Sequence, residues 1–284
     1  MRRTTPLLVM VVGAAIVFLC GMPRASADPI LYGTAYNGNT GLASLYTIDS
    51  TSGAATLVGA TGFEAVGAID FDPLNGVLYG AGKDPNSGSL GLITINPTTG
   101  LATEVGANGL TFQDISFRKD GTLFGYSSGN IYKLNLTTGA GILLGSVGDR
   151  FLTSGNALAF SPDGTLYKAD ESDLRTIDQT NGGGTVTMGL SYPESNSRAN
   201  GMAFDLSTGT LWASVKSNTE NYLATINVTT GVVTDIGTTV PGLDSLAVSP
   251  VPEPSTWTAG LLAASALLYS ISRRRAPRVS SPRG

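Results

Sequence analysis

The chain has 284 residues, of which 42% are hydrophobic and only 13% charged, and it is rich in Gly (37) and Pro (14). This composition offers both a core and many turns, and it argues against disorder and coiled coils. The chain has no His, and its one Cys is Cys20. These absences exclude Ser-His-Asp catalysis, disulfides and thiolate metal sites, so the sequence contains no catalytic constellation and favours a non-enzymatic role.

Residues 1–27 have the order of a secretory signal peptide. Arg2 and Arg3 precede an apolar run from Leu7 to Cys20, and Ala25-Ser26-Ala27 follows. Small residues at Ala25 and Ala27 predict cleavage by signal peptidase after Ala27. The alternative is an uncleaved membrane anchor, but the run is shorter than the ~20 residues that span a bilayer.

The body between residues 28 and 250 is acidic. It contains 9 basic and 20 acidic residues, which give a net charge of -11, whereas the two ends of the chain are basic. An acidic body repels phosphate backbones, so we expect no nucleic-acid partner.

An apolar phrase that ends in a turn recurs five times along the body. Its anchor residues are Phe71, Phe117, Phe160, Phe204 and Val248. They are separated by 46, 43, 44 and 44 residues, a period typical of propeller blades.

Three further strand signals accompany the anchors. A second phrase places an aromatic residue after a Gly turn, as in Thr165-Leu166-Tyr167, and a third ends in a Thr-Gly type turn, as in Ile95 to Gly100. A last short strand closes on Gly59, Gly106, Gly145, Gly189 or Gly237. Four short strands in each unit, separated by turn residues, predict an all-β fold.

The order of the phrases predicts how the ring closes. The body begins with the second phrase, without the apolar anchor phrase before it, and it ends with an anchor phrase that no second phrase follows. Pairing residues 246–249 with residues 30–33 completes the last blade and removes two open edges. We therefore predict a five-bladed β-propeller of four-stranded blades with 3+1 closure. An open β-sandwich or a solenoid is the competing fold.

The phrase Phe-Ser-Pro-Asp-Gly-Thr-Leu-Tyr at 160–167 resembles phrases of NHL-type and YncE-like repeat propellers. Many propellers contain such phrases, so the resemblance supports the fold and carries no function.

Oxygen-bearing side chains stand four residues before four of the anchors, where we expect the blades to line a central channel. They are Gln113, Asn156, Asn200 and Asp244, with Gly67 at the fifth position and Glu64 just upstream. Amide and carboxylate oxygens suit Ca²⁺, so the sequence offers a channel ligand or metal site. The alternative is that these side chains cap turns. Asn156 and Asn200 lie in phrases similar to those of gluconolactonase-like calcium hydrolases, which implies a Ca²⁺-dependent lactonase as the alternative function. A redox quinoprotein is a weaker third hypothesis.

Residues 251–284 have three parts in a fixed order. Pro252-Glu253-Pro254 precedes an apolar stretch over 256–272, and the basic cluster Arg273-Arg274-Arg275 follows at once. The prolines end any preceding strand or helix, the stretch is just long enough to span a bilayer, and the arginines favour the cytoplasmic side. These features predict a C-terminal transmembrane helix with the body outside.

This order resembles the PEP-CTERM sorting signal of Gram-negative bacteria. The resemblance implies that an exosortase recognises the tail near Pro252-Glu253-Pro254 and that the host makes exopolysaccharide. A plain membrane anchor is the alternative.

Together these features predict an exported protein, held in the membrane by its C-terminal helix until it is sorted to the cell surface or beyond. We expect it to act as a binding or structural module for an extracellular polysaccharide or an envelope protein.

Overall fold

The computed structural model describes residues 29–36, 38, 40–148 and 155–250. All the regular secondary structure in this part of the chain is β, in 20 strands. The described residues include no helix with the length and hydrophobicity that a membrane span requires. The predicted signal helix and the predicted transmembrane helix at 256–272 fall outside these ranges.

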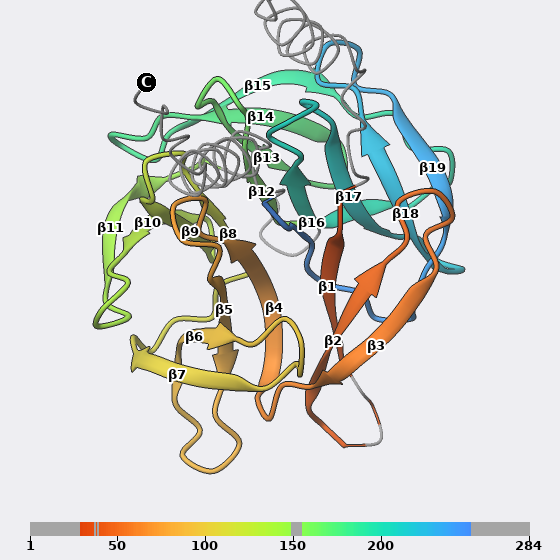
Figure 1. Cartoon of the computed structure of the whole chain (residues 1–284). Coiled ribbons are helices and arrows are strands. Elements are labelled where there is room, and N and C mark those ends of the chain that lie inside the picture. Colours follow the sequence, from red (N-terminus) through yellow and green to blue (C-terminus); the bar gives the residue numbers. More distant parts are fainter. Residues whose placement is uncertain (1–28, 37, 39, 149–154, 251–284) are drawn as a thin grey trace, which may run out of the picture.

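The strands form five antiparallel sheets of four strands each, arranged as blades around a central axis where the sequence predicts the channel (Figure 1). This arrangement confirms the predicted five-bladed propeller. The innermost strands of blades 1 to 5 are β20 (Ala247–Val248), β4 (Glu64–Phe71), β8 (Asp114–Phe117), β12 (Ala157–Phe160) and β16 (Arg198–Phe204).

The other three strands of each blade follow outward from the channel. Blade 1 continues with β1 (Leu31–Tyr36), β2 (Ala43–Ile48) and β3 (Ala55–Ala60), and blade 2 with β5 (Leu78–Lys83), β6 (Leu90–Ile95) and β7 (Ala102–Ala107). Blade 3 continues with β9 (Leu123–Ser127), β10 (Asn130–Leu134) and β11 (Gly141–Ser146). Blade 4 has β13 (Leu166–Ala169), β14 (Asp173–Ile177) and β15 (Gly184–Gly189), and blade 5 has β17 (Leu211–Lys216), β18 (Asn221–Ile226) and β19 (Val233–Thr238).

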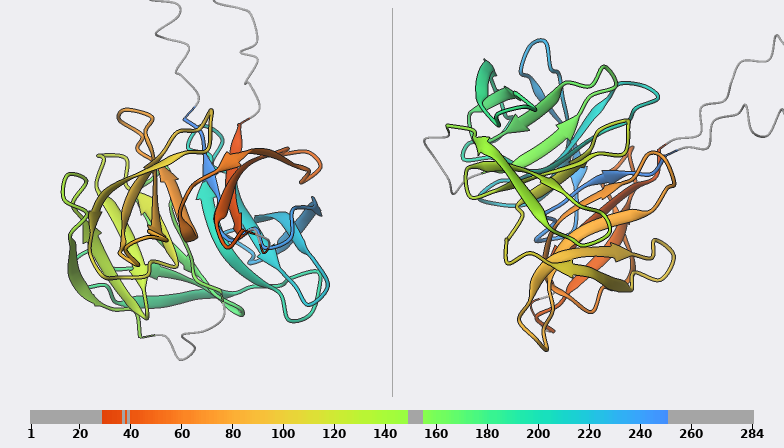
Figure 2. Two further views of the ribbon diagram at one scale, coloured as in Figure 1. Left: turned by 90° about the horizontal axis from the view of Figure 1, so that it is seen from below. Right: turned by 90° about the vertical axis from the view of Figure 1, so that its left-hand side faces the viewer.

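Blade 1 is built from both ends of the body. Strand β20 pairs with β1 through Leu31↔Val248 and Tyr32↔Ala247, and the Ser249 N–H donates to the Ile30 carbonyl at 2.9 Å. Figure 2 shows the two described ends side by side on one face of the disc. The predicted 3+1 closure is therefore present, and the ring leaves no blade with an open inner edge.

The hydrophobic core is divided into five clusters, and each cluster lies between two neighbouring blades. Four anchors make aromatic contacts across these interfaces, with ring centroids 5.1 to 5.9 Å apart. The pairs are Tyr32–Phe71, Tyr79–Phe117, Phe124–Phe160 and Tyr167–Phe204. At the fifth interface Trp212 and Val248 belong to one cluster. The repeated aromatic positions thus hold the blades together.

The outer strands carry a second repeated contact between blades. In blade 1 the backbone of Gly59 lies against the Thr99–Gly100 turn of blade 2, and a Cβ on Gly100 would stand 2.6 Å from the Gly59 carbonyl oxygen. Gly100 also has a φ of +80°, a conformation that favours glycine. The other pairs around the ring are Gly106 with Gly139, Gly145 with Gly182, Gly189 with Gly231, and Gly237 with Gly53.

A bulge in every outer strand inserts one extra residue. In blades 1, 2, 3 and 5 this residue is apolar and packs against the core, whereas in blade 4 it is the exposed Thr187. In blade 2 the register shifts so that Leu92 pairs with Gly106 but Ile93 pairs with Glu104, which leaves Val105 as the extra residue. Val105 packs against the cluster between blades 2 and 3. The bulge therefore adds an apolar side chain next to the glycine that allows the close backbone contact.

Candidate functional site

The positions four residues before the anchors gather at one end of the channel. The Asn156 N–H donates to the Ala199 carbonyl at 3.1 Å, and a Cβ on Gly67 would stand 2.9 Å from Asp244 Oδ2. Neighbouring members of the predicted ring are thus neighbours in space. Each lies at or near the beginning of an inner strand, and Asn200 is the extra residue of a bulge in β16.

Gln113 serves its own blade. Its side-chain oxygen accepts a hydrogen bond from the Ser128 N–H at 2.9 Å, and Ser128 occupies the hairpin turn between β9 and β10 with a φ of +49°. This contact is the turn-capping role that was the alternative to a cation ligand.

Three oxygen-bearing positions remain at this end. Among the described residues Asn156 Oδ1 has no hydrogen-bond partner although the atom is buried. Asp244 is exposed to solvent, but the surrounding protein raises the pKa of its carboxyl to about 6, against the opposing charges of Lys216 and Arg198. No three His, Cys, Asp or Glu side chains of the described part come close enough together to hold a metal ion. The calcium hypothesis stays a prediction that rests on Asn156, Asn200 and Asp244.

Polar contacts between inner strands involve a position that the sequence analysis did not single out, the residue just before the anchor. Asp70 Oδ2 accepts a hydrogen bond from the Phe117 N–H of the next blade at 2.7 Å, and Oδ1 accepts one from Phe71 N–H at 2.8 Å. Ser116, at the same position in blade 3, accepts one from the Phe160 N–H of blade 4 at 3.0 Å. The other three blades have Ala159, Ala203 and Ala247 here.

Asp114 links three blades. It is fully buried, and its Oδ2 accepts hydrogen bonds from Leu158 N–H at 2.7 Å and Met202 N–H at 3.4 Å, while Oδ1 accepts one from Ile115 N–H. Burial raises the pKa of Asp114 well above its usual value, and the nearby Asp70 contributes in the same direction. Asp114 therefore fastens the inner strands together across the channel.

Asp70 is a titratable group at the other end of the channel from Asp244. Its residue is only partly buried. Desolvation raises the pKa of its carboxyl to about 7, the hydrogen bonds from Phe117, Phe71 and Ser116 oppose that rise, and the charge of Asp72 adds to it. Near neutral pH Asp70 is thus present in both protonation states. A carboxyl that titrates there inside a channel marks a functional-site candidate.

The channel end that carries the anchors opens into a cavity, which we call the mouth pocket. Its volume is about 320 Å³, and residues of all five inner strands or the segments just after them line it. Asp70 and Ser116 contribute polar groups, and the aromatic and aliphatic lining consists of Phe71, Phe117, Phe160, Phe204, Leu74, Leu206, Val248, Pro73, Pro250 and Ala203. Lys119, Asp205, Ser207 and Ser249 complete the lining. A mostly apolar cavity with a few convergent polar groups is the usual form of a small-molecule site.

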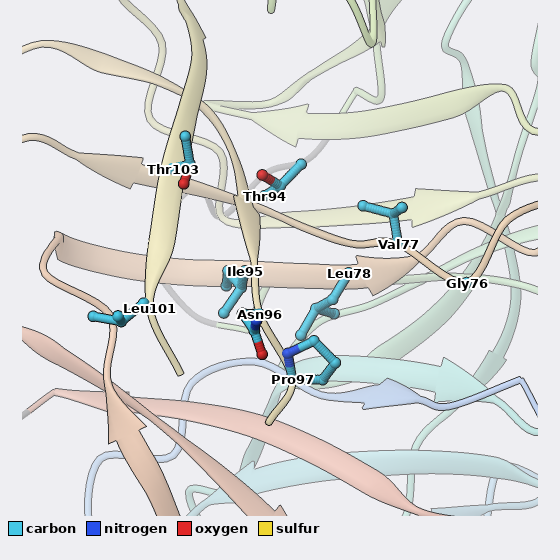
Figure 3. Close-up of a pocket in the computed structure, with 9 residues that line it drawn as sticks. All are labelled: Gly76, Val77, Leu78, Thr94, Ile95, Asn96, Pro97, Leu101 and Thr103. Carbon is cyan, nitrogen blue, oxygen red and sulfur yellow. The ribbon is translucent and has the colours of Figure 1, made fainter. Parts of the chain in front are cut away.

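A second hollow lies on blade 2 alone (Figure 3). Its side chains come from β5, β6, β7 and the turns beside them, and include the exposed Leu101. The side-chain oxygen of Asn96 caps its own turn by accepting from the Thr98 and Thr99 N–H groups. The other polar side chains of the hollow are the hydroxyls of Thr94 and Thr103, and it contains no titratable group, so it offers less chemistry than the mouth pocket.

The remaining predicted site residues fall outside the described ranges. They are Ala25 and Ala27 of the signal, Pro252, Glu253 and Pro254 of the sorting motif, and Arg273, Arg274 and Arg275 of the basic cluster.

Comparison with known proteins supports the fold. No family model and no curated protein sequence matches the chain. A chain in the crystal structure of a nidogen/laminin complex is 12% identical with a TM-score of 0.51, and the match covers 78% of this chain and 98% of the other. A protein from a study of the de novo evolutionary emergence of a symmetrical protein is 19% identical with a TM-score of 0.46, over 79% of this chain and 100% of the other. At 12% identity, the likeness to the chain of the nidogen/laminin complex extends to the fold alone.

Proposed function

We propose that this protein is an exported binding module that a PEP-CTERM-type tail directs to the cell surface or the extracellular matrix. One observation carries the binding role: a closed, rigid ring of blades has a cavity that all five inner strands line. A propeller of similar fold occurs in the nidogen/laminin complex, which is consistent with a binding module. The partners we propose are an extracellular polysaccharide or an envelope protein.

The sorting role rests on the sequence of the tail. Pro252-Glu253-Pro254, the apolar stretch over 256–272 and the arginine cluster follow one another in the order that an exosortase substrate requires. The last described residue, Pro250, lies at the mouth pocket beside the first strand of the body.

Fractionation of the host tests the sorting proposal. The double variant Pro252→Ala/Glu253→Ala should stay with the inner membrane, whereas the unmodified protein should leave it. A matched control is Pro282→Ala, which changes a proline of the same tail beyond the basic cluster and should leave the distribution unchanged. Identical distributions for the double variant and the unmodified protein would refute the proposal.

A further inference from the structure

We propose that the mouth pocket binds a small organic ammonium ion, with the nitrogen at Asp70 and the apolar part among the phenylalanine rings. The inference goes beyond the proposed function, because it concerns the pocket chemistry of the protein wherever the protein is sorted. Three features of the pocket support this proposal: the size and apolar character of its walls, an unused hydrogen-bond acceptor position on the Asp70 carboxylate, and the negative local charge.

The walls suit an apolar body of modest size. The volume of about 320 Å³ lies at the lower end of the range of about 300–1,000 Å³ for small-molecule sites. Phe71, Phe117, Phe160 and Phe204 line it, and each ring is held by an aromatic partner from the neighbouring blade. Phenyl rings also attract an organic cation through the negative charge of their faces.

The Asp70 carboxylate can accept a further hydrogen bond. Oδ1 accepts one bond, from Phe71 N–H, although a carboxylate oxygen has two acceptor positions. Ser116 Oγ lies beside it and donates to Oδ2 at 3.3 Å. No ion pair joins Asp70 to a basic side chain within the described part of the chain. An ammonium N–H group would therefore meet a carboxylate that lacks a cationic partner.

The charge around Asp70 is mostly negative, which favours a cation over a neutral or anionic ligand. Asp72 on the same segment is a nearby acid, and Asp205 after β16 lines the pocket. Asp114 on β8 also lies near Asp70, but its raised pKa favours the neutral form. Lys119 after β8 is the one basic side chain in the lining. The lining residues from β20 and the segment after it, Val248 to Pro250, have no titratable side chain. The body as a whole has a net charge of -11.

Binding should depend on pH, because only the ionised Asp70 attracts an ammonium ion. Burial raises the pKa of Asp70 to about 7. The affinity for an alkylammonium ion should thus rise as the pH increases from 5.5 to 8 and then level off. An Asp70→Asn variant should show no such rise.

Calorimetric titration of the purified full-length chain with n-butylammonium chloride at pH 8 tests the proposal. We expect n-butylammonium to bind at least tenfold more tightly than 1-butanol, which has the same apolar body, and n-butyrate to show no binding. Asp70→Asn should reduce the affinity for the amine to that for the alcohol. Asp163→Asn removes an acid from a turn on the same face that does not line the pocket, and it should retain the affinity.

Ala203→Leu gives a second variant that keeps Asp70 but fills the pocket, because Ala203 is part of the lining. It should abolish binding of both the amine and the alcohol. Equal affinities for amine and alcohol in the unmodified protein, or undiminished amine affinity in Asp70→Asn, would overturn the proposal. If Asp70→Asn does not fold, the folded Ala203→Leu variant tests the proposal. Amine binding that is retained in Ala203→Leu would show that the ligand binds outside the mouth pocket. Neither variant should change the result of host fractionation, so the two proposals fail separately.

Discussion

The chemistry of the channel depends on which residue precedes each anchor. Asp70 and Ser116 connect blade 2 to blade 3 and blade 3 to blade 4, whereas alanine occupies the equivalent positions of the other blades. Alanine has no hydrogen-bonding group and little volume, so the interior beside Ala203 stays open as part of the mouth pocket. The polar groups of this ring, Asp70 and Ser116, therefore lie on one side of the pocket, and alanines occupy the other three positions.

The raised pKa of Asp70 predicts how stability depends on pH. Its value is about 7 in the folded protein, against 3.8 for the carboxyl in an unfolded chain. Between these values the folded state holds the proton and the unfolded state does not. The free energy of unfolding should therefore be highest near pH 4 and fall toward pH 7, by up to a few kcal/mol from this group. Asp114, whose pKa is also raised, acts in the same direction.

Urea denaturation at several pH values checks this prediction. Asp70→Asn should flatten the decrease of the free energy of unfolding between pH 4 and 7. Asp163→Asn is a suitable control, because hydrogen bonds, first that of Ser161, lower the pKa of Asp163, so its titration lies below this interval. The prediction fails if the unmodified protein and Asp70→Asn lose stability equally over the interval.

At the scale of a strand, the backbone of the next blade lies close to the glycine near the end of each outer strand. A Cβ on Gly106 of β7 would overlap the carbonyl oxygen of Thr138 in blade 3. In blade 4 the bulge is displaced by one residue, since Leu174 pairs with Met188 and Arg175 with Val186. A Cβ on Gly189 would consequently meet only the Ser172 carbonyl oxygen, at 3.8 Å. The same sequence signal therefore has two different structural settings.

Gly106→Ala should be far more harmful than Gly189→Ala. The first substitution places a methyl group against backbone atoms that cannot rotate away, which we expect to cost about 3 kcal/mol. The second should change the stability by less than about 1 kcal/mol. Thermal unfolding followed by circular dichroism compares them, and we expect the midpoint of Gly106→Ala to fall by about 6–12 °C. Equal midpoints for the two variants would contradict this account of the blade contact.

At the scale of the whole molecule, the ring is closed by strands from opposite ends of the body. Strand β20 has only two paired residues, but Leu243 and Leu246 just before it are fully buried between blades 5 and 1. Additional hydrogen bonds join the segments, from Asp244 N–H to the Thr34 carbonyl and from Ser249 N–H to the Ile30 carbonyl, both at 2.9 Å. Closure thus depends on a short segment with a large buried apolar surface.

A circular permutant tests the closure. Joining Pro250 to Pro29 through a short Gly-Ser linker, with new ends between Asn86 and Ser87 in an exposed turn, should preserve the fold because the old ends are already adjacent. A chain truncated after Gly242 should instead lose about 10 °C or more in its unfolding midpoint and self-associate through the exposed edge of β1. Calorimetry and size-exclusion chromatography measure both effects. An unfolded permutant, or a truncated chain as stable and monomeric as the full one, would show that the closure is unimportant.

The sequence by itself determined the number of blades, the strands in each and the closure, because each blade repeats the same turn residues and the same anchors. These signals are local, and a period near 45 residues has few structural solutions. It also indicated that Gln113, Asn156, Asn200 and Asp244 gather at one channel end, since equivalent positions in a ring lie at one level. Their common role as ligands stays a prediction, and Gln113 Oε1 already accepts a hydrogen bond from the Ser128 N–H.

Only the tertiary structure decided that the cavity and the carboxyl of Asp70 lie at the opposite end of the channel from Asp244. Asp70 looks in the sequence like one polar residue in a strand, and its raised pKa arises from burial by neighbouring blades. The outer bulges are equally invisible in the sequence, because a one-residue register shift depends on how the next blade packs. The burial and desolvation of Asp70 and the close contacts between blades are properties of the assembled ring. The turn residues and anchors that define each repeat are properties of the local sequence.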